Sequence, residues 1–108
     1  MAYQHRYLDG SPLDLPVGKI VCIGRNYLDH IRELNNAVPE TPILFMKPAT
    51  ALSPLGEPIQ LPKGRGECHH EVELAVLVGR ELRSVDAAMA QKAVAGYGIA
   101  LDLTLRDL

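Results

Sequence analysis

The feature that most constrains this 108-residue chain is the segment Glu71–Val78, which has the length and composition of a β-strand. Side chains alternate along a strand, and one face here is entirely apolar, formed by Val72, Leu74, Val76 and Val78. The other face begins with Glu71 and Glu73 and continues with Ala75 and Leu77, so the strand becomes apolar on both sides. We therefore predict a central, covered strand that carries two acids at one end.

The two acids on this strand are expected to lie on the same face, about 6.6 Å apart along the backbone. Carboxylates this close repel one another unless a positive charge compensates them. A divalent cation would supply that charge. The alternative is that Glu71 and Glu73 lie on a solvated strand edge, which is the common setting of a Glu-x-Glu sequence.

A third acid comes from a second predicted strand, residues 96–103. Asp102 shares its face with small residues, namely Gly98, Ala100 and Thr104, which leave room for a ligand. Three carboxylates without a soft ligand favour magnesium, manganese or calcium over zinc. The neighbouring His69 and His70 point to opposite faces of the strand, so we do not expect them to bind one ion together.

A histidine and a glutamate lie one turn apart in a predicted helix over residues 26–34. His30 and Glu33 are spaced i, i+3 and are therefore neighbours on one helical face. A carboxylate beside an imidazole fixes its tautomer and raises its basicity, which suits a general base that activates water. An ordinary surface pair with no catalytic role is the alternative.

Other compact apolar runs predict further elements, and Gly/Pro-rich stretches separate them. The remaining predicted elements are strands at Tyr3–Leu8, Lys19–Ile23, Ile43–Met46 and Ile59–Leu61, and a helix at 84–94. The chain is thus predicted to be a β-rich α+β domain.

Charge and hydropathy exclude several classes of partner. The net charge is −2 and the pI about 6.0, so there is no basic surface for nucleic acid or anionic membrane. No apolar run is long enough to span a bilayer, and the polar amino terminus does not resemble a secretory signal. We expect a cytoplasmic protein in which Cys22 and Cys68 are both thiols.

Four segments in register carry a family resemblance over nearly the whole chain. They are Gly24–Glu33 (GRNYLDHIRE), Pro42–Pro48 (PILFMKP), His69–Leu74 (HHEVEL) and Gly96–Asp107, which ends in DLTLRD. Together they resemble the fumarylacetoacetate hydrolase family. The likeness is greatest to its small, single-domain members, the acylpyruvate hydrolases and oxaloacetate decarboxylases.

This resemblance implies a role for each candidate residue. Glu71, Glu73 and Asp102 would bind Mg²⁺ or Mn²⁺, with Ca²⁺ as a further ion that crystals can carry. His30 and Glu33 would form a water-activating dyad. Arg106 would hold a carboxylate or carbonyl of the substrate.

The resemblance also implies a fold and an activity. The chain would be part of the family's mixed β-sandwich roll and would cleave a C–C bond in acylpyruvate-type 2-oxo acids, with oxaloacetate decarboxylation as a related activity. We expect residues 1–108 to be the amino-terminal portion of one catalytic domain, truncated after Leu108 and inactive alone. The full-length protein would be a homodimer that binds a small 2-oxo acid.

Three alternatives remain open from the sequence. One is an isomerase or decarboxylase of dienoic diacids from aromatic catabolism. Another is a non-catalytic truncated fragment that binds metal or a partner chain. The third is a small α+β module whose charges are simply solvated.

Overall fold

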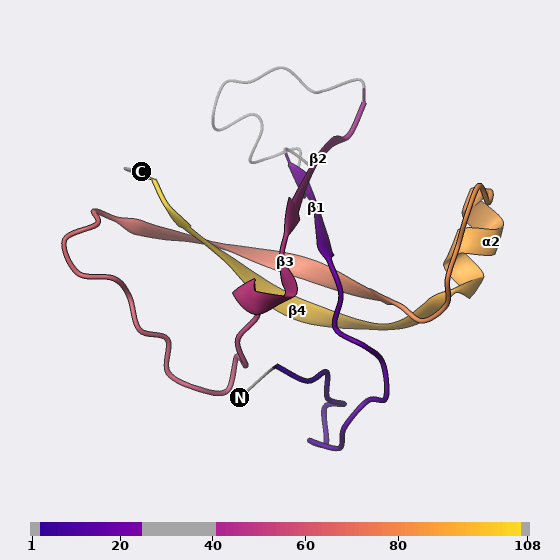
Figure 1. Cartoon of the computed structure of the whole chain (residues 1–108), viewed down its shortest axis with the longest axis horizontal. Coiled ribbons are helices and arrows are strands. Elements are labelled where there is room, and N and C mark those ends of the chain that lie inside the picture. Colours follow the sequence, from indigo (N-terminus) through magenta and orange to yellow (C-terminus); the bar gives the residue numbers. More distant parts are fainter. Residues whose placement is uncertain (1–2, 25–40, 107–108) are drawn as a thin grey trace. The chain divides into compact units, whose positions relative to one another are not determined.

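The computed structural model describes residues 3–24 and 41–106 (Figure 1). In chain order its elements are β1 (Ile20–Gly24), β2 (Ile43–Lys47), the short 3₁₀ helix η1 (Ala49–Ala51), β3 (Cys68–Val78), α2 (Ala87–Lys92) and β4 (Val94–Leu105). Most of the described residues in regular structure belong to strands, which confirms the β-rich prediction. The chain divides into two compact units, Met1–Ser53 and Pro54–Leu108.

The first unit contains one antiparallel pair of strands. β1 pairs with β2 from Ile20 opposite Lys47 to Gly24 opposite Ile43, as expected for two short apolar runs. The predicted strand at Tyr3–Leu8 is wrong, because this stretch forms only an isolated bridge between Arg6 and Pro12. A turn intervenes between those two residues, and its backbone hydrogen bonds replace a strand ladder.

That turn is closed by a side chain as well as by the backbone. Asp9 Oδ1 accepts hydrogen bonds from the Ser11 hydroxyl at 2.6 Å and from the Ser11 N–H at 2.9 Å. These bonds favour the ionised form, so the Ser11 hydroxyl, and after it the Ser11 N–H, holds the pKa of Asp9 below its usual value. Gly10 has φ +90°, a conformation that glycine adopts without steric cost.

The second unit is built on the antiparallel pair of β3 and β4. The register runs from Cys68 opposite Leu105 to Leu77 opposite Gly96, and it shifts between Leu77 and Val78. β3 therefore begins three residues before the predicted start at Glu71, because the preceding residues also have partners on β4.

The connection between β3 and β4 contains α2, which is shorter than predicted. Asp86 accepts a hydrogen bond from the Met89 N–H at 2.8 Å and so caps the helix amino terminus. The helix ends at Lys92 and not at Val94, because Val94 already pairs with Val78 in the β-ladder. No described helix has the length and apolar character needed to cross a membrane.

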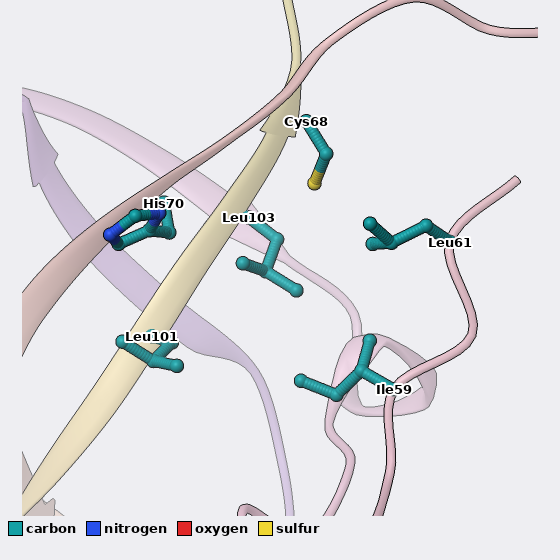
Figure 2. A pocket seen from close by; sticks show the side chains of 6 residues that line it. All are labelled: Ile59, Leu61, Cys68, His70, Leu101 and Leu103. Atoms are coloured by element: carbon teal, nitrogen blue, oxygen red, sulfur yellow. The ribbon is translucent and has the colours of Figure 1, made fainter.

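The loop that precedes β3 contributes side chains instead of a strand. The predicted strand at Ile59–Leu61 is wrong, since these residues have no ladder partner. Their side chains turn toward β3 and β4 and line a hollow of about 420 Å³ (Figure 2). Its other lining residues are Cys68, His70, Leu101 and Leu103. Cys22 and Cys68 are not joined in a disulfide, as predicted.

The apolar face of β3 is exposed in this chain. Val72 and Leu74 are each 64% exposed, and Ile99 across the ladder is 70% exposed. The prediction of a covered central strand is therefore wrong for this chain as it stands, because β3 has only β4 as a strand neighbour among the described residues. Within the same residues, Ala93 is the only buried apolar side chain.

Candidate metal centre

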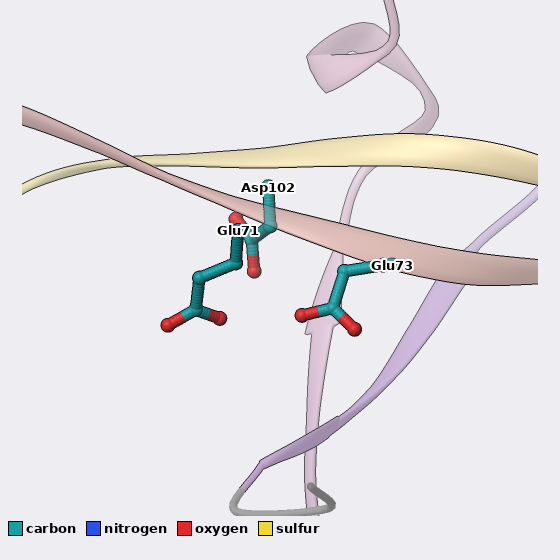
Figure 3. Close-up of side chains that lie close together, drawn as sticks. All are labelled: Glu71, Glu73 and Asp102. Atoms are coloured by element: carbon teal, nitrogen blue, oxygen red, sulfur yellow. The ribbon is translucent and has the colours of Figure 1, made fainter. Parts of the chain in front are cut away.

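Three carboxylates converge on one face of the β3–β4 pair. Glu71 and Glu73 project from β3, and Asp102 projects from β4 toward the same side (Figure 3). The register places Glu71 directly opposite Asp102 and Glu73 opposite Ala100. Alternation along each strand and antiparallel pairing between them are sufficient to bring the three acids together.

The spacing of these acids suits a single small cation. Each residue offers an oxygen such that all three oxygens lie within 4.8 Å of one another. Three such points share a centre at most about 2.8 Å away, close to the metal–oxygen distances of about 2.0–2.6 Å for Mg²⁺ and Ca²⁺. Small side-chain rotations would close the difference.

The surroundings of the acids leave them partly accessible. All three are half-buried, and small residues of β4, Gly98 and Ala100, share their face. A Cβ built on Gly98 would meet nothing within 4 Å, so space remains beside the acids, as the sequence predicts. A ligand can therefore approach this face without displacing a bulky side chain of β4.

Arg106 contacts the acidic group directly. Its Nη2 donates to Glu71 Oε1 at 3.2 Å, and its backbone N–H donates to the Glu67 carbonyl at 3.3 Å. The backbone bond continues the β3–β4 pairing just beyond β4. The structure thus brings the predicted substrate residue to one of the predicted metal ligands, Glu71, through a direct contact that the sequence alone did not predict.

The two adjacent histidines separate as alternation requires. His69 Nε2 lies 2.9 Å from Glu67 Oε2, whereas His70 lines the hollow on the opposite, apolar face. Among the described residues, the group able to hold a metal consists of the three carboxylates and includes no histidine. The His69–Glu67 pair was also missed, although the two residues share strand parity with Glu71.

The predicted dyad cannot be placed relative to this group. His30 and Glu33, and the helix predicted around them, lie outside the described residues. Their catalytic role therefore stays a prediction from the sequence.

Similarity to known proteins agrees with this geometry. A family model described as "Fumarylacetoacetate (FAA) hydrolase C-terminal" matches residues 19–108. The chain belongs to the fumarylacetoacetate hydrolase family. The resemblance found in the four sequence segments is thus confirmed, and the β3–β4 pair with its acids lies wholly within the matched region.

Two similar proteins of this family are named oxaloacetate tautomerases. The chain is 56% identical to the oxaloacetate tautomerase YcgM of Escherichia coli (strain K12) over 106 residues, 98% of this chain and 48% of that protein. It is 51% identical to the mitochondrial oxaloacetate tautomerase of Bos taurus over 89 residues, 82% of this chain and 40% of that protein. The chain therefore spans about half the length of these relatives or less.

Solved structures give the same family. A protein from Yersinia pestis CO92, provisionally assigned to the fumarylacetoacetate hydrolase family, superposes with a TM-score of 0.92 at 50% identity, over 97% of this chain and 48% of that one. A protein from Burkholderia cenocepacia, provisionally named a fumarylpyruvate hydrolase, gives 0.76 at 38% identity, over 99% and 46%. The β-rich chain is thus consistent with the family's fold.

The donor set is appropriate for a metal cofactor of the kind used by this family. Three carboxylates are hard oxygen ligands with a combined nominal charge of −3, which suits Mg²⁺, Mn²⁺ or Ca²⁺ better than zinc. Glu71 and Asp102 face each other as like charges across the ladder, and such a pair is unfavourable unless positive charge compensates it. The residues present therefore fit a divalent ion.

Proposed function

We propose that the protein containing this chain is a divalent-metal-dependent enzyme that interconverts the keto and enol forms of oxaloacetate. The observation that carries this proposal is the convergence of Glu71, Glu73 and Asp102 on one strand face. Its supporting context is the 56% identity to an oxaloacetate tautomerase over nearly the whole chain. This proposal gives tautomerisation precedence over the C–C hydrolysis expected from the sequence.

The three acids have one common task in this proposal. Glu71, Glu73 and Asp102 hold Mg²⁺ or Mn²⁺. When bound, the cation supplies a Lewis acid that favours negative charge on the oxygen of a 2-oxo acid. Their placement on two paired strands fixes the three carboxylates before substrate arrives, which limits the reorganisation needed on binding.

The other candidate residues bind substrate and move a proton. Arg106 offers a planar guanidinium that matches a substrate carboxylate and lies beside the acids. Keto–enol interconversion moves one proton between a carbon and an oxygen of the substrate. His30, oriented by Glu33, is the proposed carrier of this proton.

Hydrolysis of an acylpyruvate is the second candidate function. It is favoured by the similarity to the Burkholderia cenocepacia protein provisionally named a fumarylpyruvate hydrolase. His30 would then take a proton from water, and the resulting hydroxide would attack the carbonyl carbon that is distal to the 2-oxo acid. Tautomerisation passes through the enolate of oxaloacetate, and hydrolysis releases the enolate of pyruvate. Both are enolates of 2-oxo acids, so the two reactions can share the acidic group.

The remaining sequence expectations enter here as proposals. We propose that residues 1–108 are the amino-terminal portion of one catalytic domain with the family's mixed β-sandwich roll. The intact protein is proposed to be a cytoplasmic homodimer, on the family resemblance.

The experiment follows the decay of enol-oxaloacetate by its ultraviolet absorbance in buffer containing Mg²⁺. The intact protein should accelerate this decay, and Asp102→Asn should reduce the acceleration by more than about 100-fold. Mutating a residue that only hydrogen-bonds to a metal ligand already lowers metal affinity or activity about 10–100-fold, and Asp102 is a proposed ligand itself. Asp86→Asn is the matched control: it makes the same chemical change at the cap of α2, where asparagine also caps. Undiminished activity of Asp102→Asn, or of protein stripped of metal by a chelator, would contradict the proposal.

A further inference from the structure

Arg106 occupies a special position relative to the acidic group. It lies four residues beyond Asp102, on the same strand parity, and its backbone is bonded to Glu67 at the start of the β-ladder. From there its side chain extends back to Glu71, with Nη2 at 3.2 Å from Oε1. The cationic side chain of Arg106 therefore occupies one oxygen of a proposed metal ligand.

The positive charge of Arg106 opposes metal binding at Glu71, because both the guanidinium and the metal ion are cations. Three carboxylates carry a nominal −3, and the guanidinium compensates one unit of it. A divalent cation bound to the same acids would have to approach a group of like charge, at a separation where the Coulomb term is still appreciable even in water. Metal and guanidinium are thus expected to oppose each other at Glu71.

The exposure of the pair makes the contact easy to exchange. The side chains of Arg106 and Glu71 are 47% and 36% exposed, so the ion pair is screened by water and contributes little to stability. Arginine also has a long side chain that can leave Glu71 while its backbone stays bonded to Glu67. An anionic ligand beside the metal would then offer it a new partner.

We propose that Arg106 is an exchangeable counter-cation of the acidic group, paired with Glu71 in the metal-free protein and released to a substrate carboxylate when the cation binds. The proposal rests on the function proposed above. It makes the sites for metal and for 2-oxo acid energetically coupled, so each ligand strengthens the binding of the other by the same factor.

If Arg106 supported the metal ligand instead of competing with the metal, its removal would change the metal affinity in the opposite direction. If its hydrogen bond held Glu71 in the correct orientation for the metal, removing it would weaken metal binding, by 10–100-fold as is typical of such outer partners. If Arg106 competes with the metal, removing it strengthens metal binding. The direction of the change therefore distinguishes the two roles.

The experiment measures Mn²⁺ affinity by isothermal titration calorimetry of the intact protein, with and without saturating pyruvate as an unreactive 2-oxo acid. Arg106→Gln should bind Mn²⁺ roughly three- to tenfold more tightly than the wild type in the absence of pyruvate. Pyruvate should tighten Mn²⁺ binding to the wild type and have little effect on the variant.

Two further variants control for charge and folding. Arg106→Lys keeps the positive charge and should retain wild-type Mn²⁺ affinity within about twofold, since the Coulomb opposition remains. Arg83→Gln removes one positive charge from the loop after β3 and should leave the affinity unchanged. That loop begins after Val78, which lies seven residues, or roughly 23 Å, along β3 from Glu71.

The outcomes separate this inference from the proposed function. If Arg106→Gln binds Mn²⁺ more tightly and pyruvate no longer tightens that binding, the result supports both the counter-cation role and the proposed function. Unchanged or weaker Mn²⁺ binding by Arg106→Gln, in a wild type that binds Mn²⁺ at the three acids, overturns the counter-cation role alone. A wild type that binds no Mn²⁺ overturns the metal site and this inference together.

Discussion

Glu71 combines several interactions at a single residue. It lies opposite Asp102 in the ladder, shares a strand face with Glu73, and accepts a hydrogen bond from Arg106. An acid used only for solubility has no need of such neighbours. The local geometry therefore favours a site over a solvated strand edge, which was the alternative for this Glu-x-Glu sequence.

The proposed dyad allows acylpyruvate hydrolysis to be separated at the residue scale from oxaloacetate decarboxylation, the related activity expected from the sequence. Hydrolysis of an acylpyruvate needs an activated water, so His30→Ala should reduce its rate about 10²–10⁴-fold. Decarboxylation of oxaloacetate needs mainly a stabilised enolate and should lose much less. The measurement is turnover of both substrates by the intact protein at saturating Mg²⁺. Equal losses would show that His30 serves binding or folding and not water activation.

Residue parity explains what the sequence predicts at this scale and what it misses. Glu71, Glu73 and Asp102 share one face because alternation is fixed by the backbone, so their convergence follows from two correctly assigned strands. The Arg106–Glu71 contact depends on side-chain torsions and on the path of the chain after β4. Those are not encoded in a periodic pattern, and the contact appears only in the structure.

At the scale of elements, the sequence predicts whether a segment is a strand or a helix better than it predicts where that element begins and ends. The two long strands and the helix between them are found, but β3 starts earlier and α2 ends earlier than predicted. Both differences have one cause. A residue that lies opposite a partner strand joins the β-ladder, whatever its own secondary-structure propensity. Ile59–Leu61 shows the reverse, because an apolar run without a partner strand stays a loop.

The tight connection after β3 gives a prediction about an element. A Cβ on Gly79 would lie 2.8 Å from the Ala95 Cβ, too close without movement of β4. The Gly79 N–H also donates to the Ala93 carbonyl at 2.8 Å, which restricts that movement. Gly79→Ala should therefore destabilise the intact protein by about 1–3 kcal/mol, measured by urea unfolding.

The matched control for this prediction is Gly56→Ala. A Cβ there would meet nothing within 4 Å, and Gly56 is not among the glycines with positive φ. Its unfolding free energy should change by less than about 0.5 kcal/mol. Equal effects of the two substitutions would show that the close approach at Gly79 is relieved at no cost.

At the scale of the molecule, the main feature of the described residues is the exposed apolar face of the β3–β4 pair. The face of β3 and β4 opposite the acids exposes Val72, Leu74, Val76, Tyr97 and Ile99 by 48–70%. Alternation predicts which residues form this face but not what covers it, because a cover depends on contacts between distant segments. An apolar face of this extent is typical of an interaction surface or of an aggregation hazard.

This surface predicts how residues 1–108 behave as an isolated polypeptide. They should aggregate, associate with a partner segment, or show negligible turnover, because the β3–β4 pair has no third strand within the part of the chain that the structure describes and has an exposed apolar face. Size-exclusion chromatography with light scattering, followed by an oxaloacetate assay, tests this. A well-folded monomer with full activity would show that no additional cover is required.

The central claim for the molecule is one hard divalent cation bound by Glu71, Glu73 and Asp102. The most direct test is the anomalous diffraction of manganese in crystals of the intact protein grown with Mn²⁺. We predict one strong peak per chain, with an oxygen of each of the three carboxylates at about 2.0–2.6 Å. A peak coordinated by His69 or His70, or no peak near the three acids, would contradict the account.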